Sequence, residues 1–547
     1  MSIETKERAK AMSRYVLMIV LLGSLASFGA TALNAPVTIS INVSAGRHPI
    51  SPLIYGVSEG SSTALKNLNA PINRDGGNNA SRYNWLINAR NLDADWYFES
   101  YPYPSSTPGA AGDSIISQSK LQGAQAMLTI PMIGWVAKLG AGRSILSSFS
   151  VAKYGPQCST DPWFPDAGNG VSSDCYTDLT GNNPTDANVA DNSTTEQAWV
   201  KHLVAKWDTA AHGGLAYYLM DNESSIWFST HRDVHPIGAH ATEIRDKVID
   251  YSAKVKAIDP GAKIVAPEEW GWDGYRFSGY DQQYAAAHGW SAFPDRQNVM
   301  GGQDYVPWLL SQWKAAGHPI DVFSLHFYPQ NGEFSDDVSS SMQLLRNRST
   351  RQLWDPHYVS ESWINAIVNL IPRMNGWVNA KYYPGTPIAI TEYNWGAEGH
   401  INGATTQADI LGIFGRYGLN IATRWTVPGA TTPTYKAMQM YRNYDGNRST
   451  FGDTGVSATG GNPDLLSAFA AQRTSDSALT VIVINKVLSG ATPVTLTLAN
   501  FTAMGSAQVY RLTAANSITH LSNQAWSGGT LKATVPPQSI TLFVLPK

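Results

Sequence analysis

Two glutamates in this sequence stand where a strand-like run gives way to polar and aromatic residues. Glu223 follows the strand-prone residues 217–220 and the pair Asp221-Asn222, and Glu392 lies near the end of the apolar run 388–396. Hydrolysis of a glycosidic bond uses one carboxylic acid to protonate the leaving oxygen and one carboxylate to attack carbon or activate water. For Glu223 the plain alternative is a turn residue, because Asp and Asn often end strands.

Other polar and aromatic side chains share this position at the ends of strand-like runs, and we expect them to bind substrate. They are Arg74, Asn222, Glu269, His326, Tyr328, Trp395 and Trp425. Arg74 and Tyr328 would also keep Glu392 ionised and oriented. The alternative is that Arg74 pairs with a loop acid such as Asp75.

The remaining members of this set carry alternatives of their own. Asn222 is expected to hydrogen-bond a sugar hydroxyl, or else only to form a turn. Trp395 and Trp425 are interpreted as flat platforms for sugar rings. Glu269 and its neighbour Glu268 could instead be structural acids that orient the proton donor.

Eight strand-like segments, separated by stretches with helical patterns, must position these residues. They span 53–58, 72–77, 126–135, 216–223, 263–270, 321–330, 388–396 and 422–428. From Ile237 to Val255 apolar residues recur at steps of three and four, which marks one helix face. Alternating strands and helices imply a parallel sheet, and eight units predict a (β/α)8 barrel with long loop insertions. The C-terminal ends of barrel strands meet at one mouth, so the candidate residues would come together there.

The last hundred residues change in character and predict an additional β-sandwich domain. The stretch 444–464 is rich in Gly, Ser and Asp and is interpreted as a connector, and six short strand-like runs without a helical period follow it. The alternating run 37–44 is expected to join this sandwich. The predicted organisation is a signal peptide at 1–35, a sandwich strand at 36–50, the catalytic barrel at 51–449 and the sandwich at 450–547.

The N-terminus has the pattern of a secretory signal. Four basic residues precede an apolar run at 15–22, and Ala30-Thr31-Ala32 offers a cleavage site. An uncleaved anchor is the alternative, although the run is shorter than the ~20 residues that span a membrane. The two cysteines, Cys158 and Cys175, are expected to form a disulfide in an oxidising compartment, with two free thiols as the alternative. We therefore expect an extracellular or periplasmic protein.

The composition narrows the class of partner. The 547-residue chain is 15% charged with a formal net charge of −3, so it has no strong basic field for nucleic acid or anionic membrane. Its 18 Trp and 25 Tyr residues provide rings that stack on sugars but also fill cores. We expect a polysaccharide substrate, no nucleic acid, no membrane contact after signal cleavage, and a monomer.

Several long stretches resemble glycoside hydrolase family 44, the endoglucanases and xyloglucanases. They include RDGGNNASRYNWLINARNLDADWYFES (74–100), YYLMDNESSIWFSTHRDVHP (217–236), IVAPEEWGW (264–272), FSLHFYPQ (323–330) and ITEYNWG (390–396). The resemblance implies a (β/α)8 barrel, endo-attack on β-1,4-glucans with retention, an acid/base at Glu223 and a nucleophile at Glu392. Two positions depart from the family pattern: Ser224 stands in place of Pro, and Asp75 in place of Trp.

The sequence thus predicts a secreted endo-β-1,4-glucanase (cellulase) that also cuts xyloglucan. The alternatives are a mannanase or xylanase on the same barrel, and a non-catalytic glycan-binding protein. The presence of both carboxylates argues against the latter. No cofactor is expected for catalysis. The acidic stretch 178–192 could hold a structural calcium ion, with a solvated loop as the favoured alternative.

Overall fold

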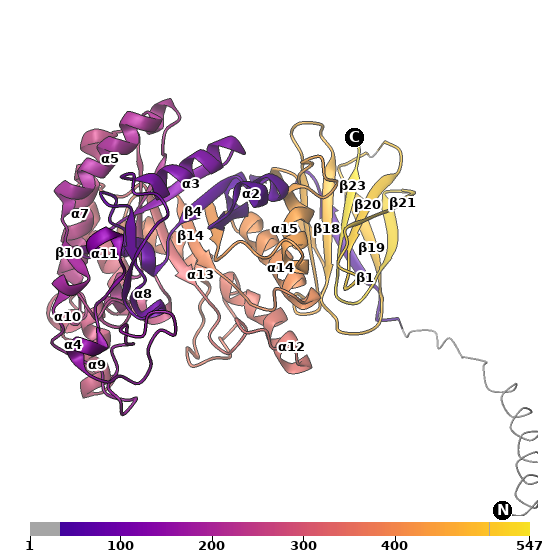
Figure 1. Ribbon diagram of the computed structural model, residues 1–547. Helices are drawn as coiled ribbons and strands as arrows, with labels where there is room; N and C mark the ends of the chain where they lie inside the picture. Colours follow the sequence, from indigo (N-terminus) through magenta and orange to yellow (C-terminus); the bar gives the residue numbers. More distant parts are fainter. Residues whose placement is uncertain (1–32, 503) are drawn as a thin grey trace, which may run out of the picture.

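A closed barrel of eight parallel strands forms the larger part of the molecule (Figure 1). The computed structural model describes residues 33–502 and 504–547. In chain order the barrel strands are β3 (Gly56–Ser58), β4 (Ile72–Asp75), β7 (Gln125–Ile130), β11 (Tyr217–Met220), β12 (Lys263–Glu269), β13 (Val322–Phe327), β14 (Ile388–Tyr393) and β15 (Ile421–Arg424). Each overlaps one of the eight predicted segments, and the predicted (β/α)8 barrel is confirmed.

A main helix follows each barrel strand and covers the outside of the barrel. In order they are α2 (Ser62–Leu68), α3 (Ala110–Leu121), α5 (Ser193–Trp207), α7 (Ala241–Ile258), α11 (Tyr305–Ala315), α13 (Leu370–Lys381), α14 (Ile401–Arg416) and α15 (Pro433–Arg442). The predicted apolar face of α7 is buried from Ala241 to Val255. Ile237 belongs to the same sequence pattern, but it precedes the helix and is exposed.

Two long insertions, residues 76–109 after β4 and 131–192 after β7, build a lobe over one side of the barrel mouth. Strands β5 (Ala89–Asn91) and β6 (Glu99–Pro102) come from the first insertion, and β9 (Leu146–Ser147) comes from the second. They form one small sheet in the order β5-β6-β9, so the two insertions are joined by backbone hydrogen bonds. The predicted disulfide between Cys158 and Cys175 is present and closes a loop in the second insertion.

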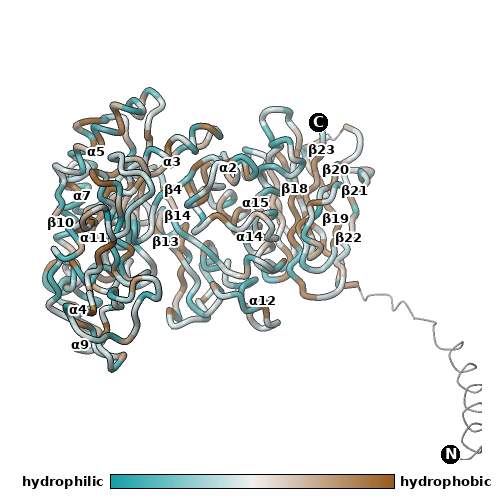
Figure 2. Tube along the Cα trace, viewed as in Figure 1, coloured by the Kyte–Doolittle hydropathy of each residue, from teal (hydrophilic) through white to brown (hydrophobic). Residues whose placement is uncertain are grey.

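The additional β domain is a ten-stranded sheet that encloses its own apolar core. Its strands are β1 (Val37–Asn42), β2 (His48–Pro49), β16 (Thr454–Thr459), β17 (Leu466–Gln472), β18 (Leu479–Asn485), β19 (Thr492–Ala499), β20 (Ala507–Leu512), β21 (Thr519–Gln524), β22 (Thr530–Val535) and β23 (Ser539–Leu545). As predicted, the N-terminal strand joins this domain, parallel to β19 and antiparallel to β16. Figure 2 shows hydrophobic stretches along the strands of this sheet.

The interpretation of residues 444–464 as a connector is wrong in part, because β16 lies within it. This strand pairs with both β1 and β17 and so occupies the middle of the sheet. Its sequence, TGVSAT, carries a glycine and small polar residues, which are weak strand formers in isolation. Pairing on both edges, rather than local propensity, makes it a strand.

The barrel and the sheet share a continuous apolar core. Helix α14 is buried over nearly its whole length because it lies between them. The ring of Phe469 on β17 leaves no room for a Cβ atom at Gly412 of α14. Lys486 after β18 forms a fully buried ion pair with Asp409 of α14, with Nζ 2.8 Å from a carboxylate oxygen. The two regions therefore pack as one unit.

Within residues 33–502 and 504–547, no helix has both the length and the apolar character to cross a membrane. Apart from residues 33–35, the predicted signal peptide lies outside the described residues and stays a prediction.

Candidate active site

Glu392 lies at the C-terminal end of β14, within a set of fixed donors. Arg74 of β4 donates from Nη1 to its Oε1 at 2.8 Å, and the Tyr328 hydroxyl donates to its Oε2 at 2.8 Å. Its side chain is only 6% exposed. Charge-assisted hydrogen bonds of this kind are short and strong, and they hold the carboxylate in one orientation. Arg74 gives its other hydrogen bonds to Glu268 and Asn222, so these groups, rather than Asp75, take up its donors.

Glu223 approaches Glu392 from a tight turn after β11. Its backbone is left-handed, with φ +46°, a conformation that costs a non-glycine residue energy and recurs at functional sites. The amide of Glu223 donates to the Glu268 carbonyl at 3.0 Å, which ties this turn to the end of β12. Its side chain is 14% exposed, more than that of Glu392. Glu223 is thus held near Glu392 and remains accessible from the mouth.

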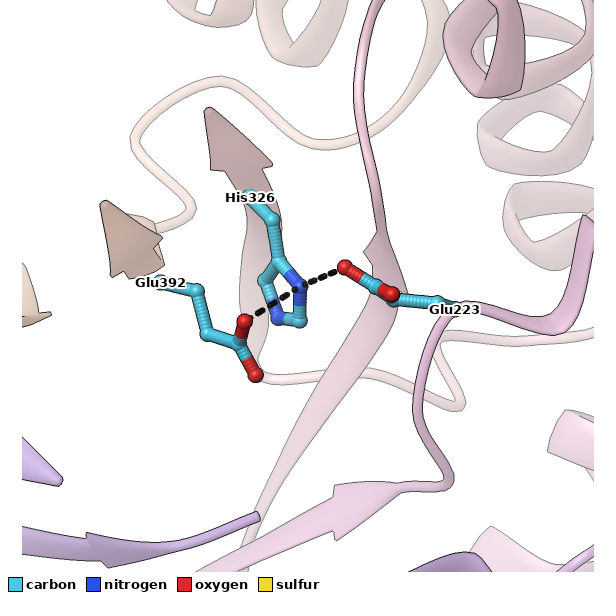
Figure 3. A group of neighbouring side chains, drawn as sticks. All are labelled: Glu223, His326 and Glu392. Carbon is cyan, nitrogen blue, oxygen red and sulfur yellow. Dashed lines mark hydrogen bonds and ion pairs between the residues drawn. The ribbon is translucent and has the colours of Figure 1, made fainter. Parts of the chain in front are cut away.

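His326 of β13 lies between the two carboxylates (Figure 3). Its Nδ1 is 2.8 Å from an oxygen of Glu223 and 3.6 Å from an oxygen of Glu392, and its Nε2 is 3.2 Å from Glu268. Burial opposes a charge on the ring, but the surrounding carboxylates outweigh it and raise the pKa of His326 to about 10. The ring is therefore an imidazolium that donates from both nitrogens at neutral pH.

The same three side chains are the one group of His and acidic residues in the described part of the chain whose donor atoms come close enough to share a metal ion. One atom from each of Glu223, His326 and Glu392 lies within 4.8 Å of the others. Both ring nitrogens of His326 already lie within hydrogen-bonding distance of carboxylates, 2.8 Å from Glu223 and 3.2 Å from Glu268, so the same arrangement forms a hydrogen-bond network. The calcium suggested for residues 178–192 stays a prediction.

The two neighbouring glutamates of β12 face opposite ways, as neighbours in any strand do, and a register shift between Pro267 and Glu269 decides which of them faces the mouth. A bulge of this kind re-aims side chains beside active sites. Glu268, with φ +57°, turns into the mouth and contacts Arg74 and His326. Glu269 turns away into the protein. The alternation of residues along the sequence does not predict this bulge.

Glu269 is fully buried, and the hydroxyl groups of Ser224 and Ser225 donate to its carboxylate at 2.8 and 2.5 Å. The prediction that Glu269 binds substrate is therefore wrong. Its place supports the stated alternative, an acid that orients the proton donor, because Ser224 directly follows Glu223. Ser224 stands where the family pattern has Pro, so a hydrogen bond here holds the turn that a proline ring would stiffen.

Burial and charge set the ionisation of the site. Burial raises the pKa of Glu223, the hydrogen bond from His326 opposes this, and the charge of Glu392 adds to it. For Glu268 burial acts in the same direction, but the contacts with His326 and Arg74 outweigh it and lower the pKa. Burial, together with the Glu392 charge, raises the pKa of Tyr328 well above its usual value. Glu223 is thus biased towards its protonated form, whereas Glu268 is biased towards its charged form.

The two predicted tryptophan platforms differ in the structure. Trp395 is 3% exposed, donates from its indole to Ser349 and packs against Phe327, so its prediction as a sugar platform is wrong. It follows β14 on the side that faces the helices, where a large aromatic ring buries much apolar surface. Trp425 is partly exposed and lies beside the Arg74 guanidinium, 5.9 Å from carbon to ring centroid. It remains a candidate for contact with sugar.

Asn222 is 2% exposed, and its two side-chain atoms are engaged. Its Oδ1 accepts from Arg74 at 3.1 Å, and its Nδ2 donates to the Oδ1 of Asn78 at 3.3 Å. Asn78 in turn donates to Asp95 at 3.2 Å. Neither Asn78 nor Asp95 is among the predicted site residues, and Asp95 lies in the insertion, outside any strand-end pattern. Contact between Asn222 and a sugar hydroxyl stays a prediction.

Comparison with known proteins agrees with this geometry. The sequence profile of glycoside hydrolase family 44 matches residues 89–331. Endoglucanase A of Paenibacillus lautus is 30% identical over 95% of this chain and 74% of its own length. A β-mannanase/endoglucanase A of Caldicellulosiruptor saccharolyticus is 30% identical over 82% of this chain, which spans about a third (34%) of that protein.

Two solved structures cover the whole architecture. The crystal structure of CelM2, a bifunctional glucanase-xylanase from a metagenome library, is 62% identical and superposes with a TM-score of 0.92 over 94% of this chain and 99% of its own. A family 44 xyloglucanase of Paenibacillus polymyxa is 29% identical, with a TM-score of 0.78 over 94% of this chain and 100% of its own. By its sequence, its fold and the full-length match to these proteins, the chain is a glycoside hydrolase and belongs to glycoside hydrolase family 44.

Proposed function

We propose that this enzyme is a retaining endo-β-1,4-glucanase in which Glu223 is the acid/base and Glu392 the nucleophile. The observation that carries the proposal is the approach of the two carboxyl groups, whose nearest oxygens lie within 4.8 Å. Retaining enzymes hold their two carboxyl groups close enough for one of them to attack the anomeric carbon directly, whereas inverting enzymes leave room between them for a water molecule. The short separation favours direct attack by Glu392.

The proposed reaction proceeds in two displacements. Glu392 attacks the anomeric carbon while Glu223 gives its proton to the departing glycosidic oxygen, which leaves a glycosyl ester on Glu392. Glu223 then takes a proton from water, and the water oxygen displaces Glu392. Arg74 and Tyr328 support this course by holding both oxygens of the nucleophile. The raised pKa of Glu223 supports its start as a proton donor.

The proposed substrates are cellulose-type glucans and xyloglucan. The names of the related proteins support a β-1,4-linked glycan, since they include an endoglucanase and a xyloglucanase. Xylan is a second candidate, because the 62% identical CelM2 is called a glucanase-xylanase. Assembly of both carboxyl groups in one site argues against a non-catalytic glycan-binding role.

We also propose that the mature protein is exported and acts as a monomer. The signal-like N-terminus supports export. The disulfide between Cys158 and Cys175 suits an oxidising compartment. The proposed chemistry needs carboxyl groups and water but no cofactor.

The test follows viscosity and reducing ends together on carboxymethylcellulose, xyloglucan, lichenan, glucomannan and xylan. An endo-enzyme lowers the viscosity of its preferred glucan much faster than reducing ends appear. Proton NMR of the first products should show the β-anomer, the configuration of the bond that was cut. Release of one short product from the start would refute endo-attack, and an α-anomeric first product would refute the role of Glu392 as nucleophile.

A further inference from the structure

Trp96 and Trp163 form an exposed stack of two indole rings on the insertion lobe. Their centroids lie 5.7 Å apart with 30° between the planes. Trp163 is 79% exposed and Trp96 is 38% exposed, so the outer ring face is open to solvent. Trp96 follows the 3-10 turn η3 (Asp93–Asp95) in the first insertion, and Trp163 lies inside the disulfide-closed loop of the second. We name this stack the indole platform.

Buried acids hold the platform from below. Asp161 is 3% exposed, and its carboxylate accepts the backbone N–H of Trp163 at 3.0 Å. Burial alone would raise the pKa of Asp161, but hydrogen bonds from the Trp163 amide, Glu99 and the Trp96 side chain outweigh it and lower the pKa. Glu99 is 1% exposed, and burial followed by the contact with Asp161 raises its pKa to about 8. The opposite shifts of the two pKa values suit one proton placed on the Glu99 side of this pair.

This support fixes two loops that are distant in the sequence. The Tyr97 hydroxyl and the Ser159 hydroxyl are 2.9 Å apart, which adds a second link between the same loops. The disulfide restricts the loop that carries Trp163. A large aromatic ring that is rigid and yet exposed costs little conformational entropy when it binds a partner.

A line of hydrogen bonds connects the platform to the candidate active site. Asn222, which precedes Glu223, donates to Asn78, and Asn78 donates to Asp95. Asp95 is the direct neighbour of Trp96, and its pKa is raised first by burial and also by the charge of Glu392. The turn η3 contacts both η2 (Asn78–Arg82) after β4 and α6 (Trp227–Thr230) after β11. The platform thus continues one wall of the barrel mouth.

We propose that the indole platform is an outer sugar subsite, in which Trp163 stacks on a glucose residue beyond those next to the cleaved bond. Glucose in a β-1,4 chain presents flat C–H faces, which suit an indole ring, and the platform offers the largely exposed ring of Trp163. The proposal rests on the proposed function. In this proposal the lobe helps to bind long glucan chains. Trp395, which was predicted to stack on sugar, is buried and cannot do so.

The test compares long and short substrates in Trp163→Ala. We expect the ratio of kcat/KM on cellohexaose to kcat/KM on an aryl cellobioside to fall by about tenfold, on the scale of losing part of a buried aromatic contact. Trp163→Phe keeps a smaller flat ring and should fall in between. Tyr176→Ala is the matched control, because this ring is 92% exposed, directly follows Cys175 at the end of the same loop and lies outside the platform. For Tyr176→Ala the ratio of the two kcat/KM values should stay within about twofold of wild type, a much smaller change than the tenfold fall expected for Trp163→Ala.

A binding experiment separates stacking from catalysis. In the Glu392→Gln background, Trp163→Ala should weaken cellohexaose binding by about tenfold in calorimetry, with Tyr176→Ala again unchanged. If wild type cleaves cellohexaose but Trp163→Ala keeps both the ratio and the affinity, the subsite is refuted while the proposed function stands. If wild type cleaves no β-1,4-glucan, the proposed function fails first. A normal unfolding temperature for Trp163→Ala and Trp163→Phe shows that the fold is intact.

Discussion

The two ends of the barrel interior use the same strands for opposite purposes. Towards the N-terminal ends lies a layer of apolar side chains, one from each of seven strands: Ile72, Met127, Leu219, Val265, Val322, Ala389 and Ile421. Two to four residues further along several of these strands lies a layer of charge, formed by the buried side chains of Arg74, Glu268, His326 and Glu392. We call them the apolar layer and the charged layer.

The comparison shows why the charged layer is the more specific of the two. An apolar layer is stabilised by filled volume, and substitutions of similar size are tolerated. In the charged layer each group satisfies two or more partners, as Arg74 does for Glu392, Glu268 and Asn222. Removing one partner from a buried pair leaves an uncompensated charge. The rigid apolar layer below supports that arrangement.

The largest effect is expected at Glu392. Glu392→Gly removes the proposed nucleophile, and kcat should fall by about 10⁴-fold or more, the scale for deleting a group that acts in concert with others. Added azide should fill the gap and give a glycosyl azide of inverted configuration. A variant that retains more than a hundredth of the activity, or an azide product of retained configuration, would remove Glu392 from this role.

Next comes Glu223, whose proton matters only when the leaving group is poor. Glu223→Gln keeps the shape, and activity on β-glucan should drop by roughly 10²–10⁴-fold, the usual contribution of general acid catalysis. Hydrolysis of an aryl cellobioside with an acidic phenol should suffer much less in its first step. Equal losses on both substrates, measured by pre-steady-state release of the phenol, would contradict acid catalysis by Glu223.

Arg74→Met tests whether the charged layer contributes to both stability and activity. The substitution removes the positive charge that pairs with the Glu268 and Glu392 carboxylates. The free energy of unfolding should therefore fall by about 3–5 kcal/mol. Arg82→Met is a matched control, because Arg82 is also fully buried and pairs with Asp233 at 3.0 Å outside the site. Denaturant titration should show a loss in both variants. Only Arg74→Met should lower kcat of the folded enzyme by more than tenfold, which corresponds to about 1.4 kcal/mol. Equal kcat values in the two variants would show that the charged layer has no special part in activity.

The apolar layer should respond in stability alone. Met127 is fully buried, and Met127→Ala should lower the free energy of unfolding by about 2–5 kcal/mol through lost burial and a cavity. Well below the unfolding temperature, kcat/KM should stay within about threefold of wild type, since a change of this size is under 1 kcal/mol. A larger fall in kcat/KM would mean that this layer also sets the geometry of the mouth.

The smallest effect is expected in the pH profile of His326→Gln. The hydrogen bond from His326 lowers the pKa of Glu223, so its loss should raise that pKa further. The proton donor is active below its pKa, and activity is lost as the pH rises through it. The basic limb of kcat/KM against pH should therefore move to higher pH than in wild type. A limb that stays in place or moves to lower pH would show that His326 does not act on Glu223.

The sequence was sufficient for the barrel and for the two carboxyl groups that carry the proposed chemistry. Eight strand-like segments alternate with helical periods, and parallel strands joined by helices put all their C-terminal ends at one mouth. Glu223, Glu392, Arg74, His326 and Tyr328 converge there for that reason. The alternation of strands and helices, together with the right-handed crossover between parallel strands, allows few other topologies.

Tertiary structure decided which of several equivalent residues face the barrel mouth or the solvent. Glu268 and Glu269 are identical neighbours, and only a strand irregularity turns the first into the mouth and the second into the protein. Trp395 and Trp163 are both tryptophans beside acidic motifs, yet one is buried under the helices and the other is open on a loop. Strand β16 exists because two neighbours pair with it. Backbone bulges, loop packing and pairing at both edges depend on contacts distant in the chain, so the pattern of nearby residues does not contain them.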